Sequence, residues 1–351
     1  MPLPPKVSPA HPGAVILGGD VGGTKTWLGL FRVDGSDTAS PLVLERSEKF
    51  ASASAGSLDE LVATFLAGSQ SRVDFACFGL PGPVRGTRAK LINLPWEVDA
   101  TEIAARFGFR SAFLINDLVA NARGIGELQT SDFETLHHGA PHATGNMAVI
   151  SPGTGLGEAG IFWDGQHHIP FACEGGHCDF APLDDTQSAL LAYLRADHDH
   201  VSVERVLSGS MGIPNIYRFL ASTRREQETP AVAAAIATQD PGATITRAAM
   251  DGSCPLCAQT MQLFVAILGA EAGNLALKTM ATGGVYIGGG IAAKILPLLR
   301  KPTLREAFCA KGRFRHFMEQ IPLRVILDDR AALLGAARHA LLAAGTPAEG
   351  E

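Results

Sequence analysis

The chain has 351 residues, of which 46% are hydrophobic and 18% are charged, and its formal net charge at pH 7 is −6. This length accommodates two domains with sizeable cores, and the acidic balance offers no basic surface for nucleic acid or an anionic membrane. We find no apolar run that approaches the ~20 residues of a membrane span. The proline-rich residues 1–14 are expected to form a disordered tail, and six sparse cysteines indicate reduced thiols in a cytoplasmic protein.

The first predicted element is a pair of strands joined by a glycine-rich turn. An apolar run from Ala14 leads into Gly18-Gly-Asp-Val-Gly-Gly-Thr-Lys25, and the apolar run Trp27–Phe31 follows. Glycines let backbone amides approach a phosphate closely. Asp20 offers a hard oxygen for Mg²⁺, directly or through water, and Thr24 offers a hydroxyl. We therefore predict a phosphate-binding turn and call residues 18–25 the first clasp.

Two commoner glycine-rich loops and a plain hairpin compete with this interpretation. A P-loop requires Lys-Ser/Thr after its last glycine and then a helix, whereas here Thr24-Lys25 stands in reverse order before a strand. A dinucleotide-binding turn also requires a helix after its glycines. A hairpin whose glycines merely make a tight turn remains possible for this segment taken alone.

Strands and helices alternate in the rest of the first half, which favours an α/β architecture. We expect strands over 41–46, 73–80 and 112–115, and helices over 58–66, over 100–107 and from 118, with Ser57 as the N-cap of the first helix. The strand over 112–115 delivers Asn116-Asp117 at its carboxyl end, where α/β folds place groups that face a ligand. Alternatively, Asp117 caps the helix that follows.

The second half opens with a copy of the first clasp. Met147–Trp163 again runs from an apolar stretch through a Gly-Thr-Gly turn into another apolar stretch, as in an internally duplicated fold. We call Gly153–Gly157 the second clasp; two facing clasps can hold a polyphosphate from both sides. A third element, Gly283–Ile291, is a short strand ending in three glycines before a helix, against which a purine or ribose can lie. The predicted nucleotide-binding residues are Gly19, Asp20, Gly22, Gly23, Thr24, Gly153, Thr154, Gly155, Gly288, Gly289 and Gly290.

A dense polar segment follows the second clasp. Glu174-Gly-Gly-His177-Cys-Asp-Phe-Ala-Pro182 places acids, an imidazole and glycines together, which favours a small-molecule site over an ordinary polar loop. Glu204 stands at a predicted helix start, where it could simply complement the helix dipole. Cys254 and Cys257 have the spacing of zinc ligands but lack a second pair, so we expect no zinc site. The remaining predicted elements are helices over 188–196, 257–280 and 331–344, an exposed helical excursion over 221–245 and a strand over 325–329.

Together these motifs resemble the bacterial glucokinase branch of the actin-like ATPase superfamily of sugar kinases. The resemblance covers nearly the whole chain from Ala14 to the terminal helix. The related repressor and kinase group carries a cysteine-rich zinc segment after its Glu-Gly-Gly-His, and this chain lacks that segment. The matching motifs are Gly19–Thr24, Leu114–Asp117, Gly153–Gly157, Glu174–Pro182, Val203–Gly209 and Ile287–Ile291.

The resemblance implies a duplicated ribonuclease-H-like fold with two α/β domains around a cleft. The expected small domain holds residues 15–127 plus 329–351, and the large domain holds residues 128–328. The implied sugar-binding residues are Asn116, Glu174, His177 and Glu204, and Asp117 is implied as the base that accepts the proton of the 6-hydroxyl. Because these residues come from both halves, we expect glucose to close the cleft.

The implied activity is ATP-dependent phosphorylation of D-glucose at its 6-hydroxyl, with Mg²⁺ held by Asp20 through water. The implied partners are glucose, ATP and a second copy of the chain in a homodimer. Two alternatives stay open: a kinase for mannose, fructose or an amino sugar, and a non-catalytic sugar sensor on the same fold. The presence of Asp117 argues against the sensor.

Overall fold

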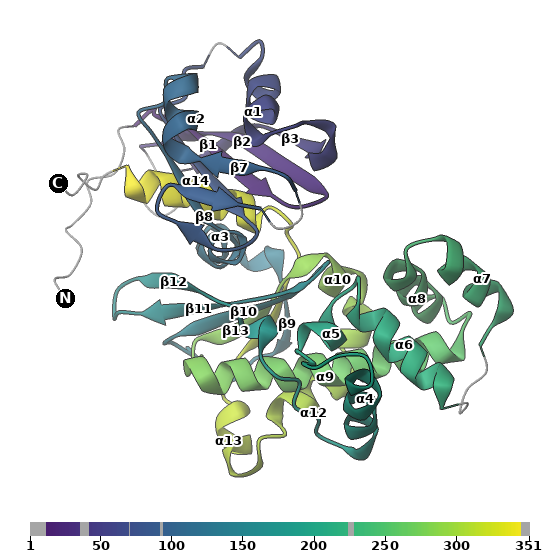
Figure 1. Cartoon of the computed structure of the whole chain (residues 1–351). Coiled ribbons are helices and arrows are strands. Elements are labelled where there is room, and N and C mark those ends of the chain that lie inside the picture. The colour runs from purple at the N-terminus through teal and green to yellow at the C-terminus, as the bar shows by residue number, and fades with distance from the viewer. Residues whose placement is uncertain (1–11, 36–41, 70, 92–93, 224–227, 345–351) are drawn as a thin grey trace. The chain divides into compact units, whose positions relative to one another are not determined.

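The computed structural model describes residues 12–35, 42–69, 71–91, 94–223 and 228–344 (Figure 1). The chain divides into two compact units: unit 1 is residues 1–129 with 330–351, and unit 2 is residues 130–329. The sequence analysis places these boundaries at 127/128 and 328/329. Of the expected tail, residues 1–11 lie outside the described part, whereas the Gly13 amide already donates to the Val33 carbonyl at 2.8 Å.

Unit 1 is built on a five-stranded sheet in the order β3-β2-β1-β4-β8. Strands β3, β2 and β1 are antiparallel neighbours, and β1, β4 and β8 run parallel. The strands are β1 (Val15–Val21), β2 (Lys25–Val33), β3 (Leu42–Ala51), β4 (Phe75–Leu80) and β8 (Ser111–Asn116), and a separate three-stranded sheet holds β5 (Val84–Arg85), β6 (Arg88–Lys90) and β7 (Glu97–Asp99).

Helices cover both faces of this sheet, because successive side chains of a strand point to opposite faces. Val15 and Leu17 of β1 pack in one core with α1 (Leu58–Leu66) and α2 (Ala100–Phe107). Ile16, which lies between them, packs in a second core with α3 (Asp117–Gly124) and α14 (Ala331–Ala343). The expected bounds of α1 and α2 are confirmed.

Unit 2 repeats the arrangement in a six-stranded sheet of order β12-β11-β10-β13-β14-β9. The antiparallel hairpin strands β12, β11 and β10 are followed by the parallel strands β13 and β14, as in unit 1, and this confirms the expected duplication. The added edge strand β9 is antiparallel to β14. The strands are β9 (Phe133–His137), β10 (Met147–Pro152), β11 (Leu156–Trp163), β12 (His168–Cys173), β13 (Gly284–Ile287) and β14 (Leu323–Ile326).

The central helix of unit 2 is α9 (Pro255–Thr279), which runs along one face of the sheet (Figure 1). By length and composition this helix could cross a membrane, so the expectation that no such run exists is wrong. However, 72% of its most apolar window is buried within the protein, among side chains of the unit 2 core. Cys254 caps this helix, because its Sγ accepts a hydrogen bond from the Cys257 amide at 3.3 Å.

The other helices of unit 2 lie mostly between β12 and β14 in sequence. The expected exposed excursion comprises parts of three helices, of which α6 and α8 have largely buried faces, and residues 224–227 lie outside the described part. The helices of unit 2 other than α9 are α4 (Asp185–Arg195), α5 (Glu204–Leu207), α6 (Gly212–Ser222), α7 (Pro230–Thr238), α8 (Pro241–Met250), α10 (Gly289–Lys294), α11 (Leu296–Leu299), α12 (Pro302–Cys309) and α13 (Arg315–Met318).

In unit 1, α3 and α14 approach each other through two glycines. A Cβ at Gly124 of α3 would overlap the Ala331 carbonyl oxygen, and a Cβ at Gly335 of α14 would overlap the Ala120 carbonyl oxygen. The absence of both side chains lets the two backbones come into direct contact. The position of α3, and therefore of its first residue Asp117, depends on this crossing.

Replacing Gly335 with alanine should destabilise unit 1 by about 2 kcal/mol, since forcing a methyl group into packed backbone costs roughly 1–3 kcal/mol. This corresponds to a fall of about 4–8 °C in the melting temperature. Gly126→Ala is the matched control, because a Cβ there meets nothing within 4 Å. Thermal unfolding followed by circular dichroism measures both variants. Equal melting temperatures for Gly335→Ala and the parent would contradict the close helix crossing.

Candidate active site

The first clasp is the turn between β1 and β2, and a buried serine holds it. The Gly22 amide donates to the Lys25 carbonyl at 2.8 Å, which closes the turn. The Ser52 hydroxyl donates to the Gly22 carbonyl at 2.7 Å, and the Ser52 amide donates to the Thr24 carbonyl at 3.0 Å. Sequence reasoning missed Ser52, because no local pattern shows that residues after β3 return to this turn.

Gly19, one of the predicted nucleotide-binding residues, has a packing role in the fold. It lies buried within β1, between Leu28 of β2 and Phe78 of β4. A Cβ at this position would stand 2.5 Å from Cδ1 of the Phe78 ring. The glycine therefore makes room for an aromatic side chain in the core.

The carboxyl ends of the parallel strands of unit 1 bring Asp20 and Asp117 to one edge of the sheet. Asp20 of β1 pairs in register with Gly79 of β4, and Leu80 pairs with Asn116 of β8. A Cβ at Gly79 would lie 2.9 Å from Cβ of Ala120 and 3.6 Å from Cα of Asp117, so this glycine lets α3 pack closely against β4. Gly79 is a second residue that the sequence analysis did not single out.

The start of α3 decides between the two interpretations of Asn116 and Asp117. Asn116 is the N-cap residue, and its Oδ1 accepts from the amides of Leu118 at 2.9 Å and Val119 at 3.3 Å. Asp117 is the first helical residue, and its Oδ1 also accepts from the Leu118 amide at 2.9 Å. Asn116 therefore caps α3 through its Oδ1, and its Nδ2 donates to the Gly82 carbonyl at 3.3 Å.

The second clasp joins β10 to β11 and is bonded to the segment that follows α5. The Gly209 amide donates to the Gly153 carbonyl at 2.8 Å, and the Ser210 hydroxyl donates to the Thr154 carbonyl at 2.7 Å. Within the turn, the Gly153 amide donates to the Gly155 carbonyl at 2.9 Å. The clasp of unit 2 is thus fixed through backbone carbonyls.

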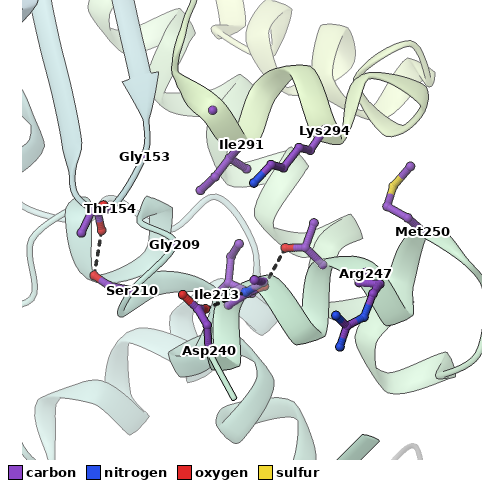
Figure 2. Close-up of a pocket in the computed structure, with 14 residues that line it drawn as sticks. Gly153, Thr154, Gly209, Ser210, Ile213, Asp240, Arg247, Met250, Ile291 and Lys294 are labelled. Atoms are coloured by element: carbon purple, nitrogen blue, oxygen red, sulfur yellow. Dashed lines mark hydrogen bonds between the residues drawn. The ribbon is translucent and has the colours of Figure 1, made fainter. Parts of the chain in front are cut away.

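A cavity of about 660 Å³ opens beside this clasp (Figure 2). Its volume lies within the usual range of small-molecule sites. Three predicted residues line it, namely Gly153, Thr154 and Gly290, and Arg247, Lys294 and Asp240 supply its charged groups. Figure 2 shows Thr154 and Ser210 at one side, with Met250, Arg247 and Lys294 at the other. These charged residues lie outside the glycine motifs, which is why the sequence analysis missed them.

Gly288 and Gly289 serve the local fold at the third element. Gly288 is buried, and its amide donates to the Ile150 carbonyl at 2.9 Å, so this amide is already used. Gly289 has φ +82°, and a Cβ there would overlap the Pro152 carbonyl oxygen. The Gly288 amide is therefore used within the fold, whereas exposed Gly290 lines the cavity.

Glu174, His177 and Glu204 converge in unit 2, as expected. Nδ1 of His177 lies 3.7 Å from Oε2 of Glu204, and Nε2 of His177 lies 4.0 Å from Oε2 of Glu174. These separations are too long for direct hydrogen bonds, so the imidazole stands between two carboxylates. The Glu204 side chain is 19% exposed, against 65% for His177, so Glu204 forms the inner wall of this group.

Backbone pairing brings these residues together from two segments. The Val203 amide donates to the Cys178 carbonyl at 2.9 Å, and the Phe180 amide donates to the Val201 carbonyl at 3.0 Å. Glu204 also reaches the second clasp, because its Oε1 accepts from the Leu156 amide at 3.3 Å. The same carboxylate therefore lies beside His177 and accepts from the second clasp, and we call this contact the Glu204 junction.

Comparison with known proteins decides the family. The sequence profile of the family described as Glucokinase matches residues 17–343. The chain belongs to the glucokinase family. A glucokinase of Trichormus variabilis is 40% identical over 338 residues, which cover 92% of this chain and 98% of the relative.

Solved structures agree with this membership. The crystal structure of a glucokinase from an Antarctic psychrotroph has a TM-score of 0.78 and 32% identity, and covers 93% of this chain and 98% of its own. A ROK family glucokinase from Streptomyces griseus, solved with glucose and AMPPNP, has a TM-score of 0.62 and 20% identity, with coverage of 93% and 99%. These neighbours confirm the duplicated actin-like ATPase fold of this glucokinase family member.

Valine at Gly153 and valine at Gly155 should have different kinetic effects. A Cβ at Gly153 meets nothing within 4 Å and points to space beside the cavity, so Gly153→Val should raise the KM for ATP while leaving that for glucose unchanged. A Cβ at Gly155 would overlap Oε1 of Glu204, so Gly155→Val should raise both constants. Each rise should be about tenfold or more, since a hydrogen bond to a charged group contributes roughly 1.5–3 kcal/mol.

Steady-state kinetics with each substrate varied in turn measures these constants. A Gly155→Val enzyme whose KM for glucose matches the parent would show that the Glu204 junction does not affect the sugar.

Proposed function

We propose that this glucokinase family member transfers the γ-phosphoryl group of ATP to the 6-hydroxyl of D-glucose, which yields glucose 6-phosphate and ADP. The observation that carries the proposal is the Glu204 junction. It joins a carboxylate and imidazole group, suited to a polyol, to a glycine turn beside a nucleotide-sized cavity. A sugar kinase requires both sites in direct contact, since the sugar hydroxyl attacks the terminal phosphate.

We propose that Glu174, His177 and Glu204 bind sugar hydroxyls. A hydroxyl both donates and accepts a hydrogen bond, so carboxylates that accept and an imidazole that can do either form a suitable set. The separations of 3.7 Å and 4.0 Å between His177 and its two neighbours leave their polar atoms unsatisfied by one another. Asn116 is proposed to contribute Nδ2 to the same sugar, because its Oδ1 is used in capping α3.

We propose Asp117 as the base that accepts the proton of the 6-hydroxyl. A carboxylate is a weak base, but it suffices because phosphoryl transfer passes through a loose transition state in which the proton leaves late. Asp117 lies at the carboxyl edge of the unit 1 sheet, where Asp20 also lies. In the closed enzyme, exclusion of water would favour the sugar hydroxyl over water as the phosphoryl acceptor.

The cavity beside the second clasp is proposed to hold the nucleoside part of ATP. Arg247 and Lys294 supply positive charge at its wall, and the side chains of Ile213, Met250 and Ile291 supply apolar surface. The amides of the two clasps are proposed to contact the phosphates. Backbone donors fixed in advance stabilise charge on the transferring group without reorganisation during the reaction.

Mg²⁺ is the metal implied by this reaction, and Asp20 fits it. Among the described residues, no group of three or more His, Cys, Asp or Glu side chains could hold a metal ion. This suits Mg²⁺, which is usually bound by one or two carboxylates together with substrate phosphates and water. When bound with ATP, Mg²⁺ neutralises negative charge on the β- and γ-phosphoryl oxygens.

A coupled assay of the purified protein with ATP–Mg²⁺ tests the proposed substrate. D-Glucose should give the highest kcat/KM in a panel with mannose, fructose and glucosamine, and ATP should exceed ADP and polyphosphate as donor. A higher kcat/KM for another hexose would replace glucose as the proposed substrate, and no turnover with any sugar would favour a sensor.

We also propose that the protein is a cytoplasmic homodimer. The six free cysteines suit a reducing compartment, and light scattering measures the mass of the assembly.

Asp117→Asn should lower kcat by about 10²–10⁴-fold, the usual contribution of a general base. Glucose affinity should stay within about tenfold of the parent, because the change removes a base rather than a binding group. Asparagine keeps an oxygen that can accept from the Leu118 amide, so α3 should still begin at the same residue. Turnover close to that of the parent would falsify the assignment of Asp117 as base.

A further inference from the structure

A buried carboxyl group lies beneath the turn that carries Glu174 and His177. Glu158 of β11 is only 2% exposed, and its Oε1 has no hydrogen-bond partner among the described residues. Burial of an unpartnered polar atom costs free energy, so its retention requires an explanation. Glu158 is not a member of any motif that the proposed reaction uses.

The two glycines of the turn rest on β11 at this point. The turn is a short 3₁₀ helix, Gly175–His177. A Cβ at Gly175 would overlap Oε2 of Glu158, and a Cβ at Gly176 would overlap the Leu156 carbonyl oxygen. Glu158 also pairs in register with Cys173, the residue before Glu174. The Glu174–His177 turn therefore packs directly against the Glu158 carboxyl group.

A second buried carboxyl group faces Glu158 from α9. Glu271 is 4% exposed; its Oε2 accepts from Nδ2 of Asn274 at 2.8 Å, and its Oε1 lies 3.5 Å from Nζ of Lys278. Burial first, and the Glu271 charge second, raise the pKa of Glu158 to about 7, although Lys278 opposes the shift. The Lys278 charge thus interacts with both buried carboxyl groups, Glu158 and Glu271.

The other titratable groups at this turn lie on β12 and on the turn itself. Burial raises the pKa of the Cys173 thiol, and the charges of Glu158, Cys178 and Glu174 add to that rise. His177 stands between Glu174 and Glu204, on the side of the proposed sugar. The Glu271 charge on α9 therefore opposes the ionisation of Glu158, and Lys278 favours it.

We propose that Glu158 is a positioning residue for sugar binding: its neutral carboxyl seats the Gly175-Gly176 turn on β11, and its ionisation beside Glu271 displaces that turn and weakens glucose binding. The inference rests on the proposed role of Glu174 and His177 as sugar ligands. Glu158 acts through the backbone of the turn, and it touches neither the sugar nor the reacting atoms.

The sign of the pH effect follows from the direction of the shift. The folded protein holds the Glu158 proton up to a pKa of about 7, whereas the unfolded chain releases it near the ordinary glutamate pKa of 4.5. The stabilising interaction of the neutral form is therefore complete below about pH 4.5, and it is lost as pH rises to about 7. Above that pH the turn packs against an ionised Glu158 carboxylate.

The experiment measures KM for glucose from pH 6 to pH 8.5 in the parent and in Glu158→Gln, whose side chain stays neutral throughout. In the parent, KM should rise by about tenfold between pH 6 and pH 8 if the ionised form does not bind glucose, as expected for one ionisation near pH 7. In Glu158→Gln this rise should disappear. In both proteins kcat and the KM for ATP should follow the same pH profile.

Glu271→Gln provides a second measurement, which also covers a failure of Glu158→Gln to fold. Removing this charge should move the rise in KM to lower pH, because a nearby negative charge no longer opposes ionisation of Glu158. Identical pH profiles of KM in the parent and either folded variant would overturn the inference, as would a loss of kcat alone. A parent enzyme without glucose turnover at any pH would instead refute the proposed function.

Discussion

The Glu204 junction is the contact on which the chemistry of unit 2 depends. Through Oε1, Glu204 accepts from the Leu156 amide at the second clasp, and through Oε2 it lies 3.7 Å from Nδ1 of His177. The short helix α5 that begins at Glu204 leads directly to Gly209, whose amide donates to Gly153. One segment of seven positions, 204–210, thereby fixes the proposed sugar group at its start and the proposed phosphate turn at its end.

The two clasps share a plan but are supported differently. Both are turns between the antiparallel hairpin strands of a sheet that continues with parallel strands. In unit 1 the buried hydroxyl and amide of Ser52 bond the turn carbonyls, whereas in unit 2 Gly209 and Ser210 do so. Duplication thus accounts for the repeated glycine turn, whereas the residues that hold the turn differ between the two units. In unit 2 the supporting segment also begins with Glu204, a proposed sugar-binding residue.

The elements that sequence predicts best are those whose ends are decided locally. Ser57 accepts from the Glu60 amide, and Asp99 accepts from the Thr101 amide, so α1 and α2 begin where a nearby polar side chain can cap them. Strand β9 was not predicted, because it exists only through pairing with β14, far along the chain. The motif residues Glu174, His177 and Glu204 were also identifiable, since their chemical types stand in recognisable patterns.

The packing role of an individual glycine could not be read from the sequence. Gly19, Gly79 and Gly288 are alike in sequence, but the missing side chain of Gly19 makes room for Phe78, and that of Gly79 makes room for Ala120. The Gly288 amide is consumed by Ile150. Which neighbour a glycine accommodates depends on strands that pair over long distances. The buried acids Glu158 and Glu271 escaped notice for the same reason, because α9 and β11 meet only in the folded unit.

Nucleotide binding in the absence of sugar tests the Glu204 junction most directly. Isothermal titration of AMPPNP–Mg²⁺ into Glu204→Ala should give a Kd about tenfold or more above that of the parent, since the Leu156 amide loses a charged acceptor. Glu174→Ala, which removes another carboxylate of the same group with no contact to the second clasp in the described structure, should bind the analogue like the parent. Equal affinities in Glu204→Ala and the parent would contradict the claim that this carboxylate organises the phosphate turn.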